Sequence, residues 1–357
     1  MGRLLTSLAG ATPAYLRSVQ QVSITIPAGS TSATATISAV DTAKTAVLFQ
    51  GVNSNNAGAA PAKSLARIEL TDATTVTAYR NTSDASITAT VQAVIFEGTS
   101  ALIKSVQHGT ITVNAAGTSN TATVNSVATG KAALVWLGQT TTETSDFAPE
   151  NFCPRITLTN STTVTANRAG NGSAVTVGFC LIEFAPAAVA SVEQRSVTFN
   201  NTNSSNTDTV SNVAAARTIL LGGGMTANDI GGLLNYCATL ARFELTDATT
   251  VTFTDATTYL MSVTYNYTVV QFATGVIRSL QRGSISLASA AQADGTVSSV
   301  NTAKAVVISN SCVPTSGSSN YDRGLSMVKL QSATAVRANR GNATGTATAG
   351  FQLVEFL

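Results

Sequence analysis

One phrase of the chain, ARIELTDATTVTAYR, recurs at a nearly fixed spacing along the whole sequence. It occupies residues 66–80 and returns as PRITLTNSTTVTANR at 154–168, ARFELTDATTVTFTD at 241–255 and SMVKLQSATAVRANR at 326–340. The four starts are separated by 88, 87 and 85 residues. A period of this length indicates a tandem repeat, so we expect each copy to form the same small structural unit.

Other landmarks keep the same period and set the repeat boundaries. Each copy opens on a serine followed by an apolar residue and then Gln or Glu, at Ser18, Ser105, Ser191 and Ser279. We therefore divide the chain into an N-terminal arm, residues 1–17, and four repeats of about 86 residues each. The repeats occupy residues 18–104, 105–190, 191–278 and 279–357.

Each repeat carries the pattern of β-strands. In the first copy, residues 22–26 (VSITI) and 32–40 (SATATISAV) alternate apolar and hydroxyl side chains, and residues 45–49 are continuously apolar. Alternation indicates a half-buried strand, whereas a continuous apolar run indicates a strand covered on both faces. Further strands are expected at 67–70, 74–79 and 86–96, with turns between them and no helical period. The sequence predicts an all-β fold of four tandem β-sandwich, jelly-roll-like domains.

A hairpin is the simplest connection between the last two strands of the first repeat. A turn at residues 81–84 would place Arg80 opposite Ser86. Glu97 would then lie at the far end of its strand, roughly 30 Å from Arg80 at about 3.3 Å per residue. Although Arg and Glu recur together at these positions, and both are replaced in the third repeat, we expect them to lie apart within one repeat.

Charged residues are unusually scarce. They make up 11% of the chain, against about 25% in ordinary soluble proteins. The net charge of +2 comes without a cluster of Lys or Arg, so we expect no binding to nucleic acid. No stretch approaches the roughly 20 apolar residues of a membrane helix, so no membrane insertion is expected. This composition suits a protein that is packed in an assembly or exposed as a weakly charged spike.

The N-terminal arm lacks the features of a secretion signal. Its apolar run is broken by Thr6 and Ser7, short of the roughly 7–15 apolar residues that a signal peptide needs. We therefore expect the protein to be made and kept in the cytoplasm before any assembly.

The residues that could carry chemistry are better explained by the repeat. His108 aligns with Gln21, Gln194 and Arg282, which predicts a solvated polar strand position. The three glutamates Glu97, Glu183 and Glu355 are one position seen in separate repeats, which argues against a shared acid/base pair. The glycines at 222–224 lack the lysine of a phosphate loop. We find no catalytic triad and no zinc spacing, so we predict no enzymatic activity, no cofactor and no metal site.

The four cysteines are distributed unevenly. Cys153 and Cys180 belong to the second repeat, Cys237 to the third and Cys312 to the fourth, while the first repeat has none. A repeat that folds without cysteine needs no disulfide framework, so free and mostly buried thiols are expected. A bridge between Cys153 and Cys180 stays open.

The longest connection of each repeat varies most. Residues 52–64, 139–152, 223–239 and 310–323 share almost nothing, and long loops on a common scaffold are usually functional. Apolar side chains in a chain with so few charges would form a sticky patch if exposed. We therefore predict that some are buried against another subunit or repeat. The candidate interface residues are Phe147, Phe152, Met225, Ile230, Leu233 and Tyr321.

The units resemble repeat modules in structural proteins of tailed bacteriophages, of the tail or fibre type. The shared phrases are SVQxxxITI, DTAKxxVL, xRxxLTxxTTVTAxR and VxEF, carried here by residues 105–113, 41–48, 155–168 and 353–356. The third repeat departs, with Asp255 and Gln271 in place of Arg and Glu. The resemblance covers nearly everything after residue 17.

The resemblance implies a non-enzymatic virion component, made in the host cytoplasm. Its partners would be other virion proteins, further copies of itself as a homo-oligomer, or a host surface glycan. One alternative is a capsid decoration protein. A second is a secreted carbohydrate-binding or adhesin array, against which the missing signal sequence counts.

Overall fold

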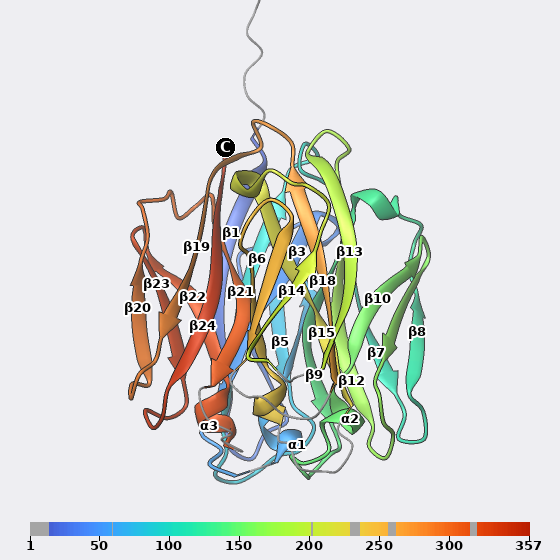
Figure 1. Ribbon diagram of the computed structural model, residues 1–357, viewed down its shortest axis with the longest axis vertical. Coiled ribbons are helices and arrows are strands. Elements are labelled where there is room, and N and C mark those ends of the chain that lie inside the picture. The colour runs from blue at the N-terminus through green and yellow to red at the C-terminus, as the bar shows by residue number, and fades with distance from the viewer. Residues whose placement is uncertain (1–13, 59, 201–202, 229–235, 256–261, 315–319) are drawn as a thin grey trace, which may run out of the picture.

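The computed structural model describes residues 14–357 except 59, 201–202, 229–235, 256–261 and 315–319. The described part consists of β-strands with a few short helical turns, so the predicted all-β class is confirmed. The sheets form a propeller-like ring. Figure 1 shows the strands side by side, with the three short α-helices at one end.

The first repeat forms two antiparallel groups of three strands. One group has the order β1-β6-β3 and the other β2-β5-β4. The elements are β1 (Leu16–Ile26), β2 (Ser32–Thr36), β3 (Thr45–Ser54), α1 (Pro61–Ser64), β4 (Arg67–Asp72), β5 (Thr75–Tyr79) and β6 (Ala89–Gly98).

The predicted hairpin between the last two strands is wrong. β5 pairs with β2 and β4, whereas β6 pairs with β1 and β3. The connection therefore carries the chain from one group of strands to the other. The physical reason is that β6 is buried along nearly its whole length, so it takes the central place between β1 and β3. The buried side chain of Arg80 then holds the connection by donating to the carbonyls of Ser30 and Ile87.

The other repeats follow the same order. The second contains β7 (Ile103–Val113), β8 (Ser119–Thr123), β9 (Ala132–Thr141), α2 (Pro149–Phe152), β10 (Arg155–Asn160), β11 (Thr163–Asn167) and β12 (Val175–Phe184). The third contains β13 (Val189–Asn200), β14 (Ser205–Thr209), β15 (Thr218–Asn228), η4 (Tyr236–Thr239), β16 (Ala241–Leu245), β17 (Thr250–Asp255) and β18 (Ser262–Phe272). The fourth contains β19 (Ile277–Ser286), β20 (Gln292–Thr296), β21 (Ala305–Pro314), α3 (Tyr321–Gly324), β22 (Ser326–Ser332), β23 (Ala335–Arg340) and β24 (Ala347–Phe356).

The recurring Thr-Val phrase supplies one side of each core. In β11, Val164 and Ala166 are fully buried, whereas Thr163 and Thr165 are partly exposed. The buried side chains pack with Val177 and Phe179 of β12, which belongs to the other group of strands. Alternation of period two thus places a methyl-bearing face inward and a hydroxyl-bearing face outward.

The repeats are joined into a closed ring, because sheets continue from one repeat into the next. β4 pairs with β9, β10 with β15, and β22 with β3, which gives three six-stranded sheets. The last two sheets are β14-β17-β16 and β19-β24-β21. They meet where the side-chain amide of Asn310 donates to the carbonyl of Phe243 at 2.8 Å. The fourth repeat therefore contacts both the third and the first.

We call each junction between neighbouring repeats a seam. Glycine makes three of the four seams possible. We call β3, β9, β15 and β21 the inner strands. Gly51, Gly138 and Gly224 are equivalent residues of the first three, and all have φ between 80° and 110°. A Cβ on Gly138 would lie 2.3 Å from the carbonyl oxygen of Ala66 in the neighbouring repeat, and one on Gly51 would lie 2.1 Å from that of Ser326. Only a residue without Cβ permits both this backbone conformation and this approach.

The fourth seam differs at the same position. Ser311 replaces the glycine and keeps a positive φ of 69°. No backbone pairing joins β16 to β21 among the described residues, and side chains bridge the two repeats instead. Besides Asn310, Gln352 donates to the carbonyl of Leu220 at 2.8 Å and accepts from its N–H at 3.0 Å.

A second polar position also lies on the seams. Gln21, Gln194 and Arg282 each donate to a carbonyl of the preceding repeat around the ring, at 3.2, 2.9 and 2.7 Å. His108 is the fourth member, and the prediction that it is a solvated strand residue is wrong. It is half-buried at the seam, its Nε2 is enclosed, and it faces Glu69 of the first repeat. The recurrence of polar residues at an otherwise variable position was the signal for a seam.

We predict that Gly138→Ala destabilises the protein by about 2–4 kcal/mol, since the added methyl is strained at positive φ and collides with a neighbouring main chain. Ser311→Gly is the matched control. Loss of the strain there is offset by the entropy of glycine, so a change below about 1 kcal/mol is expected. Urea unfolding of the full chain measures both. Equal effects of the two substitutions would contradict the role of glycine at the seams.

Acid should weaken the seam at His108. Burial lowers the pKa of His108 to about 4, below the usual value of 6.5, against the opposing influence of Glu69. A depressed folded-state pKa gives stability that is present above pH 6.5 and lost as the pH falls towards 4. His108→Gln, the residue of two other repeats, should remove this loss, on the order of 2 kcal/mol. If the unfolding free energy of wild type and His108→Gln, measured in urea, depends on pH in the same way, the prediction is refuted.

Candidate functional site

The long variable loops lie together at one end of the ring. Figure 1 shows α1, α2 and α3, which belong to three of these loops, at the lower end, and the C-terminus at the opposite end. We call the lower end, where α1, α2 and α3 lie, the loop end. Tyr236 of the third loop packs against rings of the second and fourth loops, so the described parts of all four loops lie on this side.

Neighbouring loops bind each other through main-chain hydrogen bonds. The N–H of Ala62 in the first repeat donates to the carbonyl of Glu143 in the second at 3.0 Å. The N–H of Asp322 in the fourth repeat donates to the carbonyl of Asn56 in the first at 3.0 Å. These contacts fix the loops relative to one another as well as to their own repeats.

Aromatic rings join the remaining loops. Tyr236 of the third repeat lies between Phe152 of the second and Tyr321 of the fourth, with ring centroids 5.7 and 5.9 Å away. All three side chains are buried. The pair Tyr236–Tyr321 is stacked, with an angle of 13° between the rings.

One carboxylate lies in the middle of this cluster. Asp146 of the second repeat accepts a hydrogen bond from the Tyr321 hydroxyl at 2.6 Å and from the Tyr236 N–H at 3.3 Å. The residue is fully buried, and its Oδ2 has no partner among the described residues. Burial raises the pKa of Asp146 to about 6, although both hydrogen bonds act in the opposite direction. Asp146 therefore connects three repeats through one group that titrates below neutral pH.

The candidate interface residues divide into three sets. Phe152, Met225 and Tyr321 are buried within this chain. Phe147 is 47% exposed and is the one large hydrophobic side chain that stands out to solvent among the described residues. Ile230 and Leu233 lie outside the described residues. Contact of any of them with another subunit stays a prediction.

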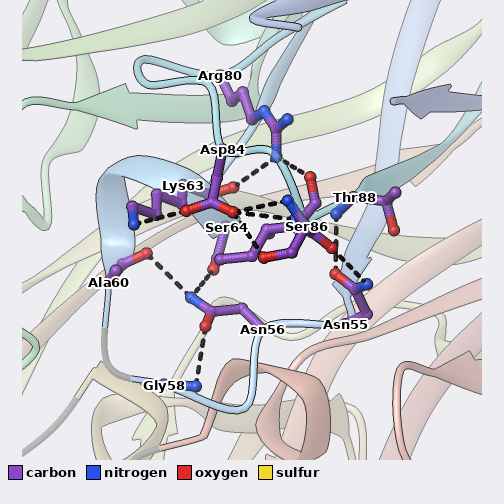
Figure 2. A network of polar contacts seen from close by, with 11 residues as sticks. Asn55, Asn56, Gly58, Ala60, Lys63, Ser64, Arg80, Asp84, Ser86 and Thr88 are labelled. Carbon is purple, nitrogen blue, oxygen red and sulfur yellow. Dashed lines mark hydrogen bonds and ion pairs between the residues drawn. The ribbon is translucent and has the colours of Figure 1, made fainter. Parts of the chain in front are cut away.

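The buried side chain of Arg80 holds the first loop through hydrogen bonds. Figure 2 shows Arg80 above Lys63 and Asp84. Its guanidinium donates to the carbonyls of Ser30, Pro27, Ile87 and Lys63 at 2.8, 2.9, 2.8 and 3.2 Å. An arginine presents five donors in a fixed fork, so a single side chain can hold several loop segments at once.

The same anchor recurs in two other repeats. Arg168 donates to the carbonyls of Asn114 and Gly117, and Arg340 to those of Leu287 and Ala290. The third repeat has Asp255 at this position instead. The recurring TVTAxR motif therefore ends in a structural clamp that the sequence did not assign.

The recurring glutamates lie at the opposite end of the ring. Glu183 accepts hydrogen bonds from Lys104 at 2.9 Å and from the N–H of Ala128 at 3.0 Å. Arg168 binds the carbonyl of Ser173, just before the start of β12, whereas Glu183 lies at the end of that strand. The expectation that Arg and Glu lie apart is confirmed, although the hairpin from which it was drawn does not exist.

Short polar contacts shape the first loop itself. Figure 2 shows the side chain of Asn56 between Gly58 and Ser64. It accepts from the N–H of Gly58 and donates to the Ser64 hydroxyl, both at 2.8 Å. Lys63 and Asp84 form an ion pair at 2.7 Å, which lowers the pKa of Asp84 together with the hydrogen bonds from Ser86.

The described residues offer few groups for chemistry. They contain no cluster of three or more His, Cys, Asp or Glu side chains that could hold a metal ion. All four cysteines are free and buried, as expected, and Cys153 and Cys180 form no bridge. Burial raises the pKa of Cys180 to about 12. Within the same residues, no helix is long and apolar enough to cross a membrane.

Rising pH should loosen the loop end. The pKa of Asp146 is higher in the folded state, about 6, than the ordinary value of 3.8. Its contribution to stability is therefore complete below pH 3.8 and is lost as the pH rises through 6. Relative to Asp146→Asn, the wild type should lose on the order of 2 kcal/mol of unfolding free energy over this interval. Urea titrations at several pH values measure the difference, and a constant difference would contradict the burial of an ionisable group.

Comparison with known proteins gives no assignment. No protein-family model matches the chain, and no curated protein matches it. Among solved structures, the crystal structure of the major capsid protein P2 from bacteriophage PM2 aligns with 46% of this chain and 98% of that chain. The two share 7% sequence identity with a TM-score of 0.15. A likeness at this level carries no argument about fold or function.

Proposed function

We propose that this chain is a non-enzymatic structural protein of a bacteriophage virion, of the tail or fibre type. Its four repeats would act as β-sandwich units of one rigid ring. The loop end would contact a partner. The observation that carries this proposal is that four unlike loops, held by one scaffold, are gathered on a single face.

The division between scaffold and loops supports a contact role. Arg80 and Arg168 donate to the carbonyls of Lys63 and Asn151 in the first and second loops, although these loops differ in sequence. A scaffold that keeps its form while the loops diverge allows each loop to fit a different part of a neighbouring surface. Contacts between loops further reduce the entropy that ordering them on binding would cost.

The exposed surface supports a protein partner more than a glycan. Glycan-binding sites use exposed aromatic rings, but Phe152, Tyr236 and Tyr321 at the loop end are buried. Phe147 is exposed on the loop between β9 and α2. We infer that Phe147 lies in an interface with another virion protein or with a second copy of this chain. A host surface glycan is the less favoured partner.

Two other placements remain candidates for the same molecule. A capsid decoration protein would use the same ring, lying on the shell. A secreted carbohydrate-binding or adhesin array would be found outside particles. The location of the chain distinguishes all three.

Immunogold electron microscopy tests the proposal. Antibodies raised against the purified chain should label the tails of intact phage particles from the source that encodes it. Label on the head would replace the tail assignment with a decoration role. Absence of the chain from purified particles, together with its presence in culture medium, would overturn the virion assignment.

A matched pair of variants tests the interface. Phe147→Ser should lower incorporation into particles without changing the melting temperature, because this side chain is exposed. Phe152→Ser should lower the melting temperature, because that ring is buried among three repeats. Normal incorporation of Phe147→Ser would place the interface elsewhere.

A further inference from the structure

A cavity of about 160 Å³ lies on the axis of the ring. The inner strands β3, β9, β15 and β21, one from each repeat, contact one another in turn around it. Its walls are mostly apolar, and they include Leu48, Phe253 and Tyr267. Tyr236 and Leu325 also line it, so the cavity adjoins the loop end.

The cavity arises from one position of the repeat. Phe49, Trp136, Gly222 and Ser309 are equivalent residues of the four inner strands, and all of them line the cavity. The rings of Phe49 and Trp136 meet edge to face, with centroids 5.2 Å apart. Gly222 and Ser309 provide no comparable bulk on the other two strands. Two large and two small residues around one axis therefore leave space that four large residues would fill.

Two polar groups of the cavity wall have no partner. Gln50 is fully buried, and neither its side-chain oxygen nor its nitrogen has a hydrogen-bond partner among the described residues. The indole N–H of Trp136 is also buried, and it has no partner within the described part of the chain. Asn310, the equivalent of Gln50 in the fourth repeat, donates to Phe243 and accepts from Gln352. Leaving a buried amide without hydrogen bonds is unfavourable, so a ligand that forms hydrogen bonds with Gln50 would stabilise the folded protein.

We propose that this cavity binds a small, neutral, mainly apolar molecule that carries one hydrogen-bonding group such as an amide. A cavity of roughly 150 Å³ accommodates a molecule of the size of benzene. No residue with a charged side chain is among the described residues that line it, which argues against an ionic ligand. The amide of Gln50 both donates and accepts, so it would pair reciprocally with an amide, while Trp136 would donate to a carbonyl.

Trp136 supplies the measurement, because it is the only tryptophan of the chain. The full chain is titrated with benzamide, toluene and benzoate while tryptophan emission and the melting temperature are recorded. Benzamide should change the emission saturably and raise the melting temperature, since a ligand that contacts all four repeats stabilises the folded ring. Toluene should bind about tenfold more weakly, for want of the hydrogen bonds. Benzoate should give no saturable change.

Variants connect the response to the cavity. Gln50→Leu keeps a similar volume and should weaken benzamide about tenfold, to the level of toluene. Gly222→Leu should fill the cavity and abolish binding of both benzamide and toluene. Circular dichroism verifies that this variant is folded. Gly130→Leu is the matched control, because a Cβ there meets nothing within 4 Å and the residue is exposed. It should bind as the wild type does.

Three outcomes would overturn the proposal. The first is a response to benzamide that stays linear, as expected if the cavity holds only water. The second is equal affinity for benzamide and toluene in the wild type, or an unchanged benzamide affinity in Gln50→Leu. The third is full benzamide binding by a folded Gly222→Leu variant, which would place the site away from the axis.

Discussion

The ring depends on a close approach between main chains at the seams. Each inner strand bends at a residue with positive φ, and the neighbouring repeat's main chain lies against that residue. Glycine satisfies both conditions at Gly51, Gly138 and Gly224, so sheets continue through three seams. At Ser311 the side chain is present, and the described residues form no backbone pairing between β16 and β21. The amides of Asn310 and Gln352 carry the contact instead. One missing Cβ thus decides whether a seam is made by backbone or by side chains.

The four similar repeats do not pack identically around the axis. A side chain that faces the axis contacts the equivalent side chains of other repeats, and these differ in size. At one end, Phe184, Phe272 and Phe356 fill the axis edge to face, with ring centroids 5.8 and 5.5 Å apart. The first repeat has Gly98 there, where a Cβ would collide with Ile103. Towards the loop end, unequal residue sizes leave the cavity beside Gln50. Divergence at axial positions therefore creates features that no single repeat has.

The loop end shows the same principle in polar groups. The loops could not be equivalent, since Asp146 of one repeat binds residues of the next two. A buried carboxylate with an unpaired oxygen is costly when ionised, which is why its pKa is raised. The benefit is a contact that joins three repeats at the centre of the face that we propose for partner binding. Stability and presentation of the loops are thus provided by the same residues.

The sequence by itself determined the local features of this protein. The period of the TTVT phrase gave the number of repeats, and alternation placed side chains such as Val164 inward and Thr165 outward. Free, buried cysteines and the separation of Arg168 from Glu183 were also predicted. The tertiary structure alone decided that β5 and β6 belong to different sheets, that the fourth repeat meets the first, and that His108 and Gln50 are enclosed. The reason is that alternation along a strand reports which face is buried but not which strand is its neighbour, and neighbours here come from distant parts of the chain.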